Sequence, residues 1–293
     1  MRLIDKVYSF VPPFLRRRIP SFRRQRRFNK IKKTKPVTKQ DILNDLRKLG
    51  LKEGDIVLVH SSLSAIGYVE GSTDTVIDAL LEAVGEDGTI MVPTFPFIDF
   101  MASYVKKNPV FDVRRTPSKM GVITEKFRQR TESLRSCHPT HSVAAIGKQA
   151  LFMTAGHENS YYPFDKSSPF WKLIEIKGYV LLLGVDYESM TVFRTFECIV
   201  SNFTFEVYLE KPVELHVIDG EGREKTVVTK VQSPKVSKIR SNSIVGEYFD
   251  KHGFSRTGYV GMARSRLIFV GDLMDRMSEL LNMGITTYKR NIK

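Results

Sequence analysis

The hydrophobic positions of this chain recur with two different spacings, and the two kinds of segment alternate from Thr38 onward. Apolar residues three and four positions apart predict amphipathic helices, whereas short continuous apolar runs predict buried strands. Helices are expected within residues 38–51, 72–85, 118–130, 167–178, 241–253 and 272–284. Strands are expected within residues 55–60, 88–95, 142–147, 179–185 and 267–270.

Capping and breaking residues mark the ends of several of these elements. Thr38 is placed to cap the first helix, and Gly50 to end it. Ser72 or Thr73 is expected to cap the second helix, which carries acidic residues in its first turns. Pro93 should mark the point at which the strand within residues 88–95 stops pairing, because proline has no amide hydrogen to donate.

This alternation of helices and strands predicts an α/β fold with a mixed, largely parallel central sheet flanked by helices on both faces. After about residue 203, two alternating runs flank the turn signal at residues 219–222. They predict a β-hairpin near residues 205–232, inserted into the α/β pattern, which then returns. Because no strong linker follows Thr38, residues 38–293 are expected to form a single domain.

The chain of 293 residues is 42% hydrophobic, which is enough for a sizeable core. It contains two cysteines without zinc-type spacing, so neither a disulfide framework nor a metal site is expected. A cytoplasmic location is expected, because two cysteines suit a reducing compartment and no apolar run approaches the roughly 18 residues that a membrane span needs.

The formal net charge of +14 comes almost entirely from an N-terminal extension at residues 1–37, which holds 13 Lys/Arg and a single acid, Asp5. Its interleaved aromatic and basic residues suit peripheral contact with an anionic membrane face. A solvated or partner-docked extension is the alternative. Nucleic acid ranks third, because no groove-reading helix or RNA-binding motif accompanies the charge.

Four polar segments lie beside the predicted strands, at residues 60–67, 93–100, 135–142 and 184–197. In α/β sheets, ligands bind beyond the carboxyl ends of the strands. Each segment alone could be an ordinary turn whose hydroxyls cap a helix. Four of them together favour a binding site at one edge of the sheet.

The ordered set of these segments resembles the aminoglycoside 3-N-acetyltransferases and their relatives. The motifs that carry the resemblance are "GDIVLVHSSLSAIG", "GTIMVPTF", "TPSKMGVITEKFR", "LRSCHPTHSVAAIG", "DKSSPFWKL" and "LLLGV…TVFRTFE". It covers roughly residues 40–200 well and residues 258–281 more loosely. The resemblance implies transfer of an acyl group from coenzyme A to an amine on a sugar.

This resemblance assigns coenzyme A to the first polar segment, where small donors let the backbone approach the pantetheine arm. The amides around Leu63 would share in that contact, and the start of the second helix would meet the phosphates. The expected cofactor-binding residues are His60, Ser61, Ser62, Leu63, Ser64, Ser72, Thr73 and Ser168. The alternative for His60 is a strand-end histidine that bonds to backbone.

The chain departs from the family at one position. The family segment usually reads Thr, two residues, His, two residues, Glu, and its histidine is taken to be the general base. Here the segment has Thr191, Arg194 and Glu197, and arginine stays protonated, so it cannot accept the proton of an amine. Glu197, His138 or His141 could serve instead. Alternatively, no base is needed if the amine arrives neutral, or the site binds without reacting.

Arg194 also bears on the acceptor, because arginine meets phosphate with two parallel hydrogen bonds. We therefore expect a nucleotide-linked deoxyamino sugar, such as a dTDP-amino sugar for surface polysaccharide, held by Arg194, Thr191 and Asp186. The alternatives are an aminoglycoside, whose positive charges Arg194 would repel, and a non-catalytic protein that binds coenzyme A or a sugar nucleotide. Arg194 could also simply pair with Glu197 within one helix.

Overall fold

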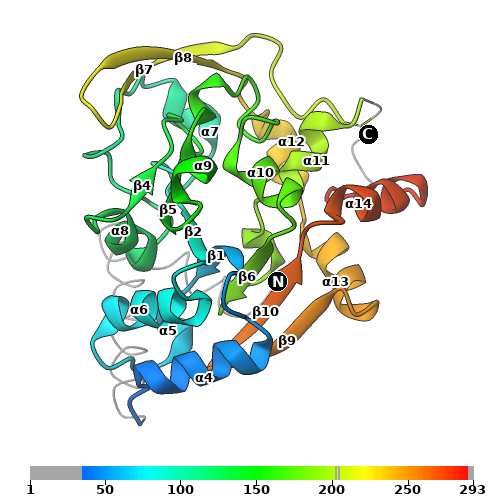
Figure 1. Ribbon diagram of the computed structural model, residues 1–293. Helices are drawn as coiled ribbons and strands as arrows, with labels where there is room; N and C mark the ends of the chain where they lie inside the picture. The colour runs from blue at the N-terminus through cyan, green and yellow to red at the C-terminus, as the bar shows by residue number, and fades with distance from the viewer. Residues whose placement is uncertain (1–34, 202, 204, 290–293) are drawn as a thin grey trace, which may run out of the picture.

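The computed structural model describes residues 35–201, 203 and 205–289, and a seven-stranded sheet forms its centre (Figure 1). The strand order is β4-β5-β2-β1-β6-β10-β9. The bounds are β4 Leu134–Arg135, β5 Val143–Gly147, β2 Thr89–Pro93, β1 Ile56–Ser61, β6 Tyr179–Leu183, β10 Ala263–Phe269 and β9 Ser255–Val260. The three central strands β2, β1 and β6 run parallel, and the outer strands are antiparallel to their neighbours. The expectation of a mixed α/β sheet is confirmed, with its parallel part in the middle.

Helices cover both faces of this sheet, as expected. Strand β1 shows why, because Val57 and Val59 join one apolar cluster while Leu58 joins the other. The first cluster is covered by α4 Lys39–Leu49, α6 Ser72–Val84 and α8 Val122–Arg128. The second is covered by α9 Ala150–Thr154, α10 Pro169–Glu175, α11 Phe193–Ile199, α13 Ser243–Lys251 and α14 Leu273–Asn282.

The ends of the first two long helices test the capping expectations. Thr38 caps α4 and forms a capping box with Asp41, and Gly50 ends the helix in the left-handed conformation at φ 106°. The cap expected for α6 is wrong. Gly71 takes that position at φ 72°, and Ser72 is already the first helical residue. Glycine adopts the left-handed turn into the helix without the strain that a side chain would bring.

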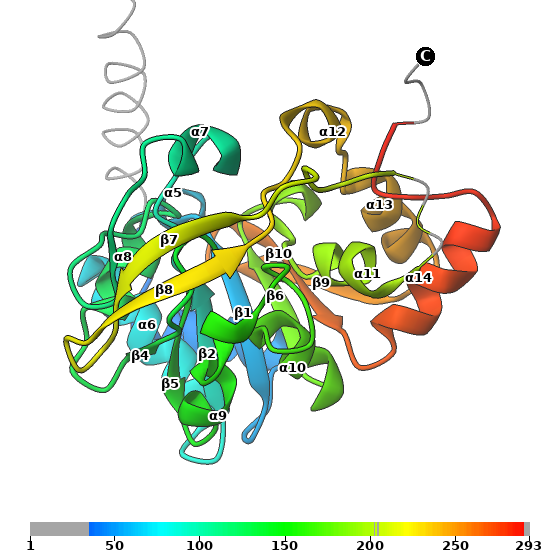
Figure 2. The same cartoon turned by 90° about the horizontal axis from the view of Figure 1, so that it is seen from above.

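The predicted hairpin is present as β7 Val213–Ile218 and β8 Glu224–Thr229, and the turn between them contains the predicted glycines. It belongs to a second sheet with the order β3-β7-β8, in which β3 Phe111–Asp112 pairs with β7 in parallel. This sheet lies at the top of Figure 1, and in Figure 2 the hairpin runs across the view. The amide of Lys230, just after β8, donates to the carbonyl of Tyr161, so the hairpin is anchored to the α/β body.

Several short elements escaped the sequence patterns because each is too short to show a period. They are α5 Leu63–Ile66, α7 Met101–Val105, α12 Pro234–Ile239 and the two 3-10 turns His157–Asn159 (η1) and Tyr187–Ser189 (η2). Strand β9 was also missed, since the sequence of Ser255–Val260 contains a glycine and two exposed polar positions. These segments connect the larger elements, and η2 contributes Glu188 and Ser189 to the site described below.

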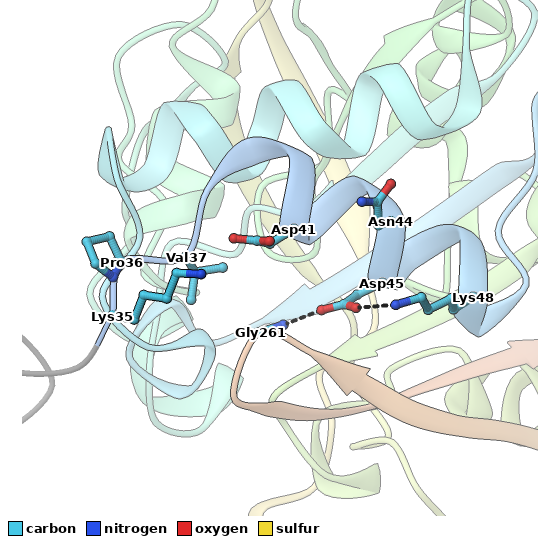
Figure 3. Close-up of a pocket in the computed structure, with 8 residues that line it drawn as sticks. All are labelled: Lys35, Pro36, Val37, Asp41, Asn44, Asp45, Lys48 and Gly261. Carbon is cyan, nitrogen blue, oxygen red and sulfur yellow. Dashed lines mark hydrogen bonds and ion pairs between the residues drawn. The ribbon is translucent and has the colours of Figure 1, made fainter.

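Most of the basic extension, residues 1–34, lies outside the described residues. The described chain enters the fold at Val37, which is buried and pairs with Val69 in an isolated bridge. A shallow surface pocket lies here between α4 and the β9–β10 turn. Figure 3 shows that the carboxylate of Asp45 within it is already engaged by Lys48 and by the amide of Gly261. Within the described ranges, no helix combines the length and the apolarity that a bilayer crossing requires.

Candidate active site

A cleft of about 260 Å³ opens at the carboxyl ends of the three parallel strands. Three of the four polar segments converge there, namely residues 60–67, 93–100 and 184–197. The residues that line it are His60, Ser61, Pro93, Phe95, Phe97, Ile98, Asp99, Met120, Thr124, Val185, Glu188, Ser189, Thr191 and Arg194. Its walls are therefore partly aromatic and partly polar, which is typical of a small-molecule site.

His60 brings an imidazole to the floor of this cleft from the end of β1, where it pairs with Leu182 of β6. The side chain is 5% exposed, and its Nε2 lies 3.3 Å from Oγ1 of Thr191. Burial, and secondarily the positive charge of Arg194, lowers the pKa of His60 to about 3. The imidazole is therefore neutral at any pH near 7.

Arg194 lies in the first turn of α11 and also lines the cleft. One guanidinium nitrogen donates to Oε1 of Gln232 at 3.2 Å, and the guanidinium lies 5.5 Å from the centre of the Phe164 ring. Its Nε has no partner among the described residues. Burial, and then the charge of Arg240, lowers the pKa of Arg194 to about 10. The side chain is therefore still a cation at neutral pH, and it cannot act as a base.

Glu197 lies three positions after Arg194, but it is engaged elsewhere. Both of its carboxylate oxygens accept from the guanidinium of Arg240, with Oε2 at 2.7 Å from one nitrogen. Thr287 and Tyr288 donate to the same carboxylate at 3.0 and 2.8 Å. Glu197 therefore forms a bidentate pair with Arg240 and does not pair with Arg194 within the helix. Glu197 does not line the cleft.

The segment at residues 135–142 lies at the same edge of the sheet, because Ser142 Oγ is 2.9 Å from Oγ1 of Thr94, just after β2. Its two histidines, His138 and His141, are nevertheless fully buried and do not line the cleft. The ring of His141 packs edge-on against Phe95, 4.6 Å between centroids, directly behind the wall of the cleft. These two candidate bases therefore lie behind the cleft wall.

The small residues expected to bind coenzyme A lie in two groups. Ser61 lines the cleft, and its buried Oγ has no partner among the described residues. Ser62 precedes α5, in which Leu63 and Ser64 are the first residues. The second group, Ser72 and Thr73, begins α6. Of these residues only Ser61 lines the cleft, and its unpartnered hydroxyl is available to a ligand.

Two further predicted residues hold backbone turns. Ser168 is fully buried and caps α10, accepting from the amide of Trp171 at 3.2 Å. Asp186 caps the 3-10 turn η2 by accepting from the amide of Glu188 at 3.1 Å. Neither side chain lines the cleft.

Three residues near the site were not singled out from the sequence. Glu188 lines the cleft, but its carboxylate accepts from the first residues of α13, among them the amide and hydroxyl of Ser243. Gln232 and Arg240 reach Arg194 and Glu197 from the segment after the hairpin. No local pattern marks these contacts, because their partners are tens of positions away in the chain.

No group of three or more histidine, cysteine or acidic side chains in the described part of the chain could hold a metal ion. Asp99 is an exposed acid at the rim of the cleft. With Glu188 engaged and Asp99 at the rim, the groups inside the cleft that a ligand could meet include the neutral imidazole of His60, the hydroxyl of Ser61 and the cation of Arg194. This set can donate hydrogen bonds to oxygens and stabilise negative charge, and it lacks a strong base.

The chain is similar in sequence to a known family of enzymes. The family model described as aminoglycoside 3-N-acetyltransferase matches residues 58–282. The chain is 33% identical over 263 residues to aminoglycoside N(3)-acetyltransferase VII of Streptomyces paromomycinus, covering 82% of this chain and 90% of that protein. It is also 33% identical to the aminoglycoside N(3')-acetyltransferase-like protein YokD of Bacillus subtilis, with 83% and 91% covered.

Solved structures agree with these relatives. A crystal structure of the aminoglycoside acetyltransferase AAC(3)-Xa matches with a TM-score of 0.73 and 30% identity, covering 89% of this chain and 96% of that one. A binary complex of AAC-IIIb with CoASH matches with a TM-score of 0.73 and 26% identity, covering 87% and 100%. The similarity therefore extends over nearly the whole α/β body.

Proposed function

Because the chain belongs to the aminoglycoside 3-N-acetyltransferase family, we propose that its cleft holds the thioester of an acyl-coenzyme A beside an amino sugar and transfers the acyl group to a sugar amine. The chain is a coenzyme A-dependent N-acyltransferase, as its relatives are named. The observation that carries the proposal for this cleft is the convergence of His60, Ser61, Thr191 and Arg194 on one space at the strand ends.

The donor is acyl-coenzyme A, and the cofactor residues are proposed from the resemblance and from their positions. Ser61 contributes an unpartnered hydroxyl inside the cleft. Ser62 leads directly into α5, which begins with Leu63 and Ser64, and the small serine side chains would let a pantetheine arm lie close to the backbone. The amino end of α6 would offer backbone amides to the phosphates.

Two acceptor classes have support. The names of the related proteins favour an aminoglycoside. Arg194 favours an acceptor with an anionic group, such as a nucleotide-linked amino sugar, because no ion pair neutralises its guanidinium and its Nε lacks a partner in the described chain. A polycationic aminoglycoside would meet this charge unfavourably.

Thiol release distinguishes the acceptors. The full chain is incubated with acetyl-coenzyme A and with kanamycin, glucosamine or a dTDP-amino sugar, and free coenzyme A is measured. We expect release that depends on an acceptor amine, and the ratio of kcat/KM values identifies the class. Arg194→Met should raise KM for the dTDP-amino sugar by about tenfold or more, since each tenfold corresponds to about 1.4 kcal/mol of lost binding. Arg115→Met, at a side chain that is 91% exposed, is the matched control.

Two results of this assay would contradict the proposal, one the transfer reaction and the other the anionic acceptor. If no amine of the panel increases coenzyme A release while calorimetry detects binding of coenzyme A, the chain is a binding protein and the transfer reaction is absent. If Arg194→Met improves turnover of kanamycin and leaves the dTDP-amino sugar unaffected, the anionic acceptor is wrong and the aminoglycoside remains.

We further propose that the basic extension brings the enzyme to an anionic membrane face. The 13 Lys/Arg of residues 1–37 support this, each contributing on the order of 1 kcal/mol near such a surface. Sedimentation with anionic vesicles should be lost when residues 1–37 are deleted. Equal sedimentation of both forms would dismiss the idea.

A further inference from the structure

The imidazole of His60 has one nitrogen engaged and one free. Within the described residues, its one side-chain hydrogen bond joins Nε2 to Oγ1 of Thr191 at 3.3 Å. The ring lines the cleft, so Nδ1 is the nitrogen that remains for a ligand. The neighbouring Ser61 Oγ is buried without a partner, which is a second indication that a polar ligand group belongs at this end of β1.

The charge state of this imidazole decides what it can do. Arg194 of α11, Glu188 of η2 and Asp99 of the loop after β2 are the charged groups that line the same cleft. Glu188 is held by the start of α13, and Asp99 is exposed at the rim. Burial and the Arg194 charge hold the pKa of His60 near 3, so the ring is neutral and presents one donor and one acceptor.

The contact with Thr191 is compatible with the tautomer that a donor role requires. Among the described residues, the hydroxyl of Thr191 makes no other hydrogen bond, so it can donate to Nε2. In that tautomer Nδ1 carries the hydrogen and is the nitrogen that can donate to a ligand in the cleft. A neutral histidine of this kind polarises a carbonyl group and does not abstract a proton.

We propose that His60 donates its Nδ1–H to the carbonyl oxygen of the bound thioester. This rests on the proposed acyl transfer. Arg194, which lines the same cleft, keeps the role proposed above at the acceptor.

The reaction step balances without a further reactant. The neutral amine attacks the carbonyl carbon, a C–N bond forms, and the carbonyl π electrons move to the oxygen, which accepts a hydrogen bond from His60. The C–S bond then breaks, and the electron pair leaves with the sulfur. The proton lost by nitrogen ends on that sulfur, which gives the amide and free coenzyme A. The acceptor amine must therefore arrive deprotonated.

Two substitutions separate a donor from a base. His60→Leu removes the N–H and should lower kcat about 10²-fold, the usual effect of losing one oxyanion donor. His60→Gln retains an N–H donor but cannot take up a proton, so it should keep most of the activity that His60→Leu loses. His141→Gln, at a buried histidine behind the wall, is the matched control and should leave kcat unchanged.

A spectroscopic readout tests the same contact without any acceptor. Isotope-edited infrared spectra of bound [1-¹³C]acetyl-coenzyme A should show the thioester C=O stretch shifted to lower frequency in the wild type and in His60→Gln, and less so in His60→Leu. An unchanged stretch in His60→Leu, or equal loss of kcat in both variants, would overturn the donor role. A shifted stretch without turnover on any amine would instead leave the donor role in place and contradict the proposed function.

Discussion

Arg194 and Arg240 both lie near the carboxylate of Glu197, and Arg240 is the residue that pairs with it. Glu197 is 7% exposed and accepts from Arg240, Thr287 and Tyr288. Arg194 is thereby left without an acidic partner, facing the cleft. Position 194 stood out in the sequence because the segment differs there from the family that it resembles. The sequence could not show which arginine would pair with Glu197, because the two partners are 43 positions apart.

Removing Arg240 should therefore destabilise the fold. Arg240→Met leaves a buried carboxylate with two neutral donors, and breaking a buried pair in this way costs about 3–5 kcal/mol of the free energy of unfolding. Arg130→Met is the control, because Arg130 pairs with carboxylates such as Asp78 that are about half exposed, and it should cost about 1 kcal/mol or less. Urea denaturation measures both. A loss for Arg240→Met no larger than the control would show that Glu197 does not depend on this pair.

At the level of elements, the long periodic segments and their strand ends were predictable, and the short connecting elements were not. Capping by Thr38 and Gly50 and the three parallel strands followed from local chemistry. The segment at residues 135–142 was harder to interpret. The segment precedes β5, and β5 runs antiparallel to β2, so the segment lies at the edge of the sheet where the cleft opens. His138 and His141 are nevertheless fully buried. The pattern of polar residues along the chain cannot show whether such side chains face the cleft or the core.

The buried histidines of this region make the fold sensitive to acid. Burial is the largest cause that lowers the pKa of each of four histidines, His60 and His138 to about 3, and His141 and His157 well below 6.5. Below pH 6.5 these histidines take up protons in the unfolded chain but remain neutral in the folded chain. The free energy of unfolding is therefore highest above pH 6.5 and decreases as the pH falls below it. In that range, each histidine should lower the free energy of unfolding by about 1.4 kcal/mol for every pH unit of acidification.

Urea denaturation between pH 7.5 and pH 5 checks this slope. His138→Gln should reduce the slope by about 1.4 kcal/mol per pH unit, whatever its effect on stability at pH 7.5. A slope that is the same in the wild type and in His138→Gln would mean that His138 is protonated equally in both states.

For the molecule as a whole, the sequence indicated one α/β body, an inserted hairpin and a basic extension. It also indicated that four polar segments would meet at one edge of the sheet, and three of them line the cleft. The sequence did not show which distant segments pack behind the site. The hairpin delivers Gln232 to Arg194, and the C-terminal segment delivers Tyr288 to Glu197. Both contacts depend on how distant segments pack, and packing of this kind leaves no periodic trace in the sequence.

We propose that acyl-coenzyme A lies in the cleft at the ends of β1, β2 and β6, with its reacting carbonyl at His60 and its acceptor near Arg194. A crystal structure with a non-hydrolysable acetyl-coenzyme A analogue would locate the donor. We expect a carbonyl oxygen about 3 Å from Nδ1 of His60 and a pantetheine arm beside Ser61. An analogue bound elsewhere, in contact with neither His60 nor Ser61, would show that this cleft is not the acyl-transfer site.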